Sequence, residues 1–125
     1  MRYYRPTWAK INLDNLEHNF FQIKKRLAPG TKILVTVKAD AYGHGLVAVS
    51  KRLTSCGVDF LGVASIDEGI TLREAGINTP VLILGLILKK DILHISLLYS
   101  QYVVHNKDPL STSLLIYPFY LYSYD

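Results

Sequence analysis

The 125-residue sequence contains a single cysteine, Cys56, so no disulfide can form within the chain. This scarcity excludes the disulfide-stapled class of small secreted proteins and is compatible with a reducing compartment. No uninterrupted apolar run reaches the ~18 residues that a membrane-spanning helix needs. The first residues also lack the apolar segment of a secretory signal. The sequence therefore predicts a cytoplasmic protein that does not span a membrane.

Charged residues are also scarce, at 19% of the chain, while half of the residues are apolar. Such a composition is typical of globular chains and excludes an intrinsically disordered protein. The net charge is +4, and the basic residues gather in the first half of the chain. Residues 24–26 form the only basic triple, which we interpret as a solvated helix face and not as a nucleic-acid contact. The histidines show no metal-binding spacing, so no metal site is predicted.

Helical and strand-like patterns alternate along the chain. Asp14 with Glu17, and Ser65 with Glu68, resemble the capping pairs that open helices, which favours capping over catalysis for Asp67 and Glu68. The short β-branched runs are typical of strands buried on both faces of a parallel sheet. The expected helices cover residues 14–27, 46–56, 66–75 and 91–98, and the expected strands cover 32–37, 60–64, 81–84 and 102–104.

The spacing of these units, roughly 23 to 27 residues, is typical of the βα units of a (β/α)₈ barrel, with a doubly wound sheet as the alternative. A complete barrel needs ~250 residues, so we expect only its first three to four βα units, within residues 1–109. Residues 110–125 are rich in tyrosine and nearly uncharged. We interpret them as an aberrant or unrelated tail, with a strand in an oligomer as the alternative.

Residues 37–45, Val-Lys-Ala-Asp-Ala-Tyr-Gly-His-Gly, carry the strongest chemical signal. They follow a predicted buried strand, and the carboxyl ends of barrel strands form the active-site face. Burial lowers the pKa of a lysine and favours its neutral, nucleophilic amine, so Lys38 is a candidate for covalent catalysis. The Tyr42 hydroxyl, four residues further on, can reach the same active-site face. The residues alone leave two alternatives open: Lys38 could be an ordinary solvated charge, and His44 could make only local hydrogen bonds.

The nonapeptide closely resembles the pyridoxal-phosphate attachment signature of alanine racemases. Residues 8–13 with His18 and Asn19 resemble the opening strand and first helix of that family. Residues 60–77 resemble its second βα unit, and residues 80–85 resemble its third strand. The resemblance extends from about residue 7 to 86, and none is apparent beyond residue 105.

The resemblance implies a homodimer whose subunits have an N-terminal barrel and a C-terminal β-domain, which an extended N-terminal strand of this chain would join. Such enzymes use pyridoxal 5′-phosphate (PLP) to interconvert L- and D-alanine for peptidoglycan synthesis. Lys38 would hold the cofactor covalently and move a proton on one face of the substrate Cα. Tyr42 would contact the cofactor phosphate, and Leu84 would lie near its ring.

Racemisation needs a second proton-transfer group on the opposite face of Cα. In the family this is a tyrosine of the C-terminal domain of the other subunit. No residue here matches it, nor the arginine that meets the pyridine nitrogen, so the 125 residues alone are expected to be inactive. A PLP-carrier barrel without racemase activity is one alternative. A racemase of the same family that acts on serine or another amino acid is the other.

Overall fold

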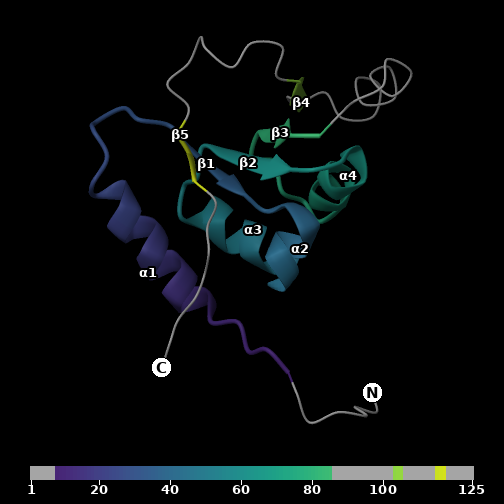
Figure 1. Cartoon of the computed structure of the whole chain (residues 1–125), viewed down its shortest axis with the longest axis horizontal. Helices are drawn as coiled ribbons and strands as arrows, with labels where there is room; N and C mark the ends of the chain where they lie inside the picture. Colours follow the sequence, from purple (N-terminus) through teal and green to yellow (C-terminus); the bar gives the residue numbers. More distant parts are fainter. Residues whose placement is uncertain (1–7, 86–102, 106–114, 118–125) are drawn as a thin grey trace.

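The structure is a computed structural model that describes residues 8–85, 103–105 and 115–117 (Figure 1). Helices and parallel strands alternate through the main described range, as the sequence predicts. None of the helices in these ranges is long and apolar enough to cross a membrane. The elements are α1 Leu13–Lys24, β1 Ile33–Thr36, α2 Lys38–Gly43, α3 Leu46–Ser55, β2 Phe60–Val63, α4 Ile66–Glu74, β3 Val81–Ile83, β4 Val103–His105 and β5 Leu115–Tyr117.

The five strands form one parallel sheet in the order β4-β3-β2-β1-β5. This confirms the predicted parallel sheet, and β4 confirms the expected fourth strand, displaced by one residue. The strand β5 lies in the tyrosine-rich tail and pairs with β1 of the same chain, with Leu34 opposite Ile116. The helix expected over residues 91–98 lies outside the described residues.

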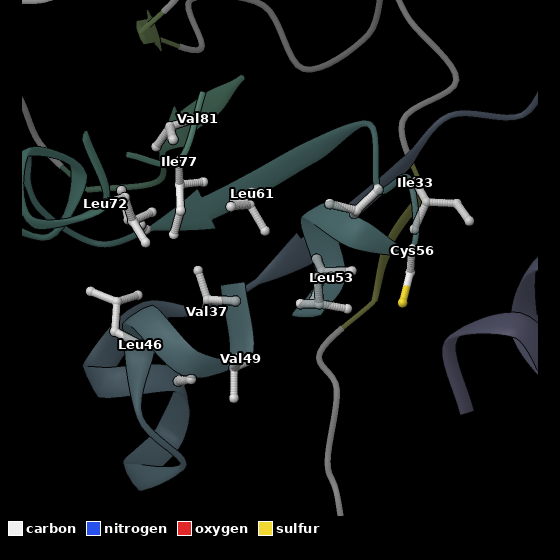
Figure 2. Packing of buried hydrophobic residues seen from close by; sticks show 14 of the residues in the cluster. Ile33, Val37, Leu46, Val49, Leu53, Cys56, Leu61, Leu72, Ile77 and Val81 are labelled. Atoms are coloured by element: carbon white, nitrogen blue, oxygen red, sulfur yellow. The ribbon is translucent and has the colours of Figure 1, made fainter. Parts of the chain in front are cut away.

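One face of the sheet packs against the helices and forms the hydrophobic core (Figure 2). Strand residues at every second position point to this face because successive side chains of a strand alternate between its two sides. The strands contribute Ile33, Val35, Leu61, Val63, Val81 and Ile83, and the helices contribute Leu16, Phe20, Leu46, Val49, Leu53 and Leu72. Figure 1 shows the helices on this side of the sheet.

Cys56, which follows α3, lies in the same core. Burial raises the pKa of its thiol above the usual value, so the residue is a packing group in the neutral form. The helix α1 begins one residue earlier than predicted, because Asn12 and not Asp14 is its N-cap. The Asn12 side chain accepts hydrogen bonds from the backbone N–H groups of Asp14 and Asn15, at 2.9 and 3.1 Å.

Glu17, the expected partner of Asp14 in the cap, instead binds Arg52 of α3 at 2.8 Å. Asp14 lies 3.2 Å from the same guanidinium, so both acidic residues tie α1 to α3. Residues 8–12 precede α1 without regular secondary structure. The extended N-terminal strand stays a prediction, since residues 1–7 lie outside the described ranges.

The start of β1 is tied to the start of β2 through Asp59. Its carboxylate accepts one hydrogen bond from the Lys32 ammonium at 2.9 Å and another from the Ile33 N–H at 2.8 Å. Burial opposes the ionisation of Asp59, but the Lys32 hydrogen bond, the Ile33 N–H and the nearby positive charges outweigh it. The pKa of Asp59 is therefore lowered from its usual 3.8.

The lowered pKa predicts a specific dependence of stability on pH. Since the carboxylate is favoured in the folded state, its contribution is fully present above the usual pKa of 3.8, which applies in the unfolded chain, and disappears as pH falls through the lower pKa of the folded state. We expect Asp59→Asn to be less stable than the wild type at pH 7, with the gap closing at acidic pH. Urea unfolding between pH 7 and acidic pH measures the difference in stability between the two proteins. Asp67→Asn, at an exposed position, is the control. A gap independent of pH contradicts the prediction.

Candidate active site

Lys38 is the first residue of α2 and the second residue after β1, at the edge of the sheet where the parallel strands end. Val37, between β1 and Lys38, is bonded to the sheet and buried in the core: its N–H donates to the carbonyl of Gly62 at 2.7 Å, and its side chain is buried against α3 (Figure 2). Lys38 itself is partly buried. The structure thus places its backbone in a fixed position at the strand end, where barrel enzymes carry their catalytic groups.

The residues after Lys38 form a left-handed helical turn, between the strand predicted over residues 32–37 and the helix predicted over residues 46–56. Four consecutive non-glycine residues have positive φ: Ala39 at 52°, Asp40 at 54°, Ala41 at 51° and Tyr42 at 55°. A left-handed conformation costs roughly 1–2 kcal/mol for each L-residue, so this turn persists only because its surroundings hold it. Strain of this kind is concentrated at functional sites.

Hydrogen bonds fix both ends of the turn. At its start, the N–H of Ala41 donates to the carbonyl of Val37 at 2.8 Å. At its end, the N–H of Gly45 donates to the carbonyl of Asp40 at 2.9 Å, and the N–H of Leu46 donates to the Asp40 carboxylate at 2.7 Å. Asp40 therefore accepts bonds through its backbone and its side chain, and it satisfies an N–H group in the first turn of α3.

His44 makes the local contacts that the sequence analysis considered for it. Its Nδ1 lies 2.9 Å from the carbonyl of Ala41 and 3.2 Å from that of Tyr42, so the protonated nitrogen donates back into the turn. Within the described ranges, no group of three or more histidine, cysteine, aspartate or glutamate side chains could hold a metal ion.

Glu68 links the turn to the neighbouring strand. One carboxylate oxygen accepts the N–H of Ala39, and the other accepts the N–H of Ala64, both at 2.7 Å. Half of the predicted capping box is present, because the Ser65 hydroxyl accepts the N–H of Glu68 at 3.3 Å. The second bond of the predicted capping box is absent. The Glu68 carboxylate does not accept the N–H of Ser65, because both of its oxygens accept the N–H groups of Ala39 and Ala64.

Tyr42 and Leu84 reach the same end of the sheet from different elements. Tyr42 belongs to the left-handed turn, and Leu84 follows β3, where its N–H donates to the carbonyl of Val63 at 2.8 Å. Each residue is 39% exposed, which is unusual for a large hydrophobic residue in the described part of the chain. The three predicted site residues, Lys38, Tyr42 and Leu84, are thus gathered at the carboxyl ends of β1 and β3.

Gly62 provides space between these strands, on the sheet face that does not meet the helices. A Cβ at this position would lie 3.0 Å from Leu34 Cδ2, 3.3 Å from Leu84 Cδ1 and 3.4 Å from Thr36 Oγ1. A side chain there would push Leu84 away. No role for Gly62 was predicted from the sequence, although a glycine inside a buried strand is a signal of close approach.

The structure predicts that the Asp40 side chain stabilises the turn. We expect Asp40→Ala to lower the free energy of unfolding by about 1–2 kcal/mol, because it removes an acceptor for the Leu46 N–H and a residue tolerant of positive φ. Asp40→Asn should stay close to the wild type, since an amide oxygen can accept the same bond. Denaturant unfolding compares the three proteins. Equal losses in both variants would show that the charge, and not the cap, matters.

Comparison with known proteins agrees with this geometry. The family model "Alanine racemase, N-terminal domain" matches residues 11–113, beyond the limit of the resemblance seen in the sequence. An alanine racemase of Carboxydothermus hydrogenoformans is 54% identical over 81 residues, which cover 65% of this chain and 22% of that protein. The chain therefore spans about a fifth of the length of the curated relatives it matches.

Solved structures show the same relationship. Alanine racemase of Clostridium difficile 630 superposes with a TM-score of 0.69 at 47% identity, covering 75% of this chain and 25% of that one. A histidine racemase of Leuconostoc mesenteroides superposes with a TM-score of 0.61 at 28% identity, covering 67% of this chain and 22% of that one. The parallel sheet is thus part of a (β/α)₈ barrel, and the chain belongs to the alanine racemase family, whose N-terminal domain it matches.

Proposed function

We propose that this chain forms the cofactor-attachment part of a PLP-dependent alanine racemase, with Lys38 as the attachment residue. The observation that carries the proposal is the placement of the partly buried Lys38 at the carboxyl end of β1, followed by a turn with fixed, strained geometry. The backbone that carries the lysine side chain is fixed there before any ligand arrives. Preorganisation of this kind lowers the entropy cost of forming a covalent bond.

The residues at this edge fit the chemical groups of PLP. The primary amine of Lys38 would hold the aldehyde carbon. The exposed apolar side chain of Leu84 would cover the aromatic ring, and the Tyr42 hydroxyl would donate a hydrogen bond to the phosphate. Amine, apolar surface and hydroxyl come from two strand ends of one sheet. This donor set therefore suits an aromatic aldehyde that carries an anionic group.

The bound cofactor supplies an electron sink that makes the Cα proton of an amino acid acidic. The free amine of Lys38 would hold or return the proton on one face of the substrate Cα. Racemisation also requires a group on the opposite face, because one lysine cannot serve both. The resemblance assigns that role to a tyrosine of the C-terminal domain of a partner subunit. A homodimer, a cytoplasmic location and a domain boundary near residue 109 are further parts of the proposal.

Two other functions would use the same residues. A racemase for an amino acid other than alanine is favoured by the structural similarity to a histidine racemase. A PLP carrier without racemase activity would use the same lysine and need no second proton-transfer group. Both share the Lys38 attachment, so the first experiment tests that attachment.

We expect PLP to modify Lys38 selectively among the nine lysines of the chain. Borohydride reduction fixes the adduct, and peptide mapping by mass spectrometry locates it. Labelling at residue 38 should exceed that at the other lysines several-fold, because Lys38 alone among the described lysines follows the carboxyl end of a strand, next to the groups proposed to bind the ring and the phosphate. Lys38→Ala should lose the selective label.

Lys51→Ala is the matched control, since Lys51 is an exposed lysine on α3. It should leave labelling at Lys38 unchanged. Uniform modification of all lysines in the wild type would overturn the proposal. With selective attachment established, exchange of the Cα proton of L-alanine, D-alanine and L-histidine in deuterium oxide would then compare the substrates.

A further inference from the structure

We propose that Glu68 is a positioning residue for Lys38: it orients the lysine by holding the peptide unit that follows it. This proposal rests on the proposed function of Lys38 and extends it to a residue on a different βα unit. Glu68 lies in the first turn of α4, thirty positions beyond Lys38 in the sequence. Its carboxylate nevertheless reaches the N–H of Ala39 at 2.7 Å.

The Ala39 N–H belongs to the planar peptide unit whose carbonyl carbon is that of Lys38. Fixing this unit relative to the sheet fixes ψ of Lys38. The same carboxylate binds the N–H of Ala64, which directly follows β2, so the anchor is the neighbouring strand and not a mobile group. The N–H of Val37 is also bound to β2, through the carbonyl of Gly62. The backbone is therefore tied to β2 immediately before and immediately after Lys38.

Helix capping does not account for this arrangement. A capping glutamate at this position would bind the N–H of the N-cap residue Ser65. Both Glu68 oxygens instead accept N–H groups outside the helix: that of Ala64, and that of Ala39 in the left-handed turn after β1. The Ser65 hydroxyl already caps the helix by accepting the N–H of Glu68. Hydrogen bonds to an ionised carboxylate are short and strong, which suits a group that must hold four residues in a left-handed turn.

The test is Glu68→Gln in the full chain. Glutamine keeps the size of the side chain and one acceptor oxygen, but its NH₂ group cannot accept from a backbone N–H. One of the two bonds is lost. We expect the rate of PLP labelling at Lys38 to fall about tenfold, while labelling of the other lysines stays unchanged. The quantity measured is the ratio of Lys38 to the remaining lysines after borohydride reduction.

Two controls separate positioning from general stability. Ser65→Ala removes the cap of α4 but keeps both Glu68 bonds, and Glu74→Gln removes an exposed charge from the other end of the helix. Thermal unfolding is measured for each variant. Positioning predicts that Ser65→Ala and Glu74→Gln keep the selective label even where the midpoint of unfolding falls as far as in Glu68→Gln. Equal loss of selectivity in Ser65→Ala would overturn the proposal.

Glu68→Asp is the second variant, used in place of Glu68→Gln if that protein does not fold. It keeps the charge but is one methylene shorter, so it cannot reach both N–H groups, and it should also lose selectivity. If Lys38 is labelled with equal selectivity in the wild type and in both Glu68 variants, the positioning role is wrong and the attachment role of Lys38 stands. If the wild type shows no selectivity, the proposed function itself fails, and the positioning role fails with it.

Discussion

The burial of one face of the parallel sheet against the helices is the constraint on which the rest of the structure depends. Because side chains alternate along each strand, Ile33 and Val35 in β1 and Leu61 and Val63 in β2 must point to the helices. A shift of one residue in register would turn these groups to the opposite face of the sheet, away from the helices. The register in turn determines where each strand ends, and therefore where Lys38 and Leu84 leave the sheet.

The left-handed turn after Lys38 is the most demanding local feature. Its residues are not glycines, so the chain itself gives no energetic preference for this conformation. The turn is held by bonds from three directions: the carbonyl of Val37 before it, Asp40 at its end and Glu68 across the sheet. A site held in this way depends on the integrity of two βα units at once. The site is thus a property of the packed sheet and not of the nonapeptide alone.

Much of the fold could be predicted because it follows from local sequence patterns. The helix α3 is marked by regular apolar spacing, α4 by the cap residue Ser65, and the first three strands by short β-branched runs. Both helices end near glycines with positive φ, Gly57 and Gly76. The cap of α1 was missed because Asn12 and Asp14 are both good capping residues, and only the backbone geometry selects Asn12.

The remaining features depend on contacts between distant segments. Nothing within residues 37–45 indicates positive φ at Ala39 or Ala41, since alanine favours the right-handed helix. The partners of Glu68 lie on two different strand ends, which no local pattern can specify. Lys38, Tyr42 and Leu84 were found through the resemblance to a known family. The structure adds that they share one edge of the sheet.

The pairing of β5 with β1 has a consequence for the order in which the sheet forms. Partners in β1 and β2 lie roughly 26 residues apart, whereas partners in β1 and β5 lie roughly 80 apart. Closing the longer loop costs about 1 kcal/mol more entropy, although β5 gains no more pairing with β1 than β2 does, three residues in each case. Pairing between segments distant in sequence is slow to form, because the loop must close before the contacts reward it. During folding, the outer edge of β1 therefore stays available to other strands until β5 arrives.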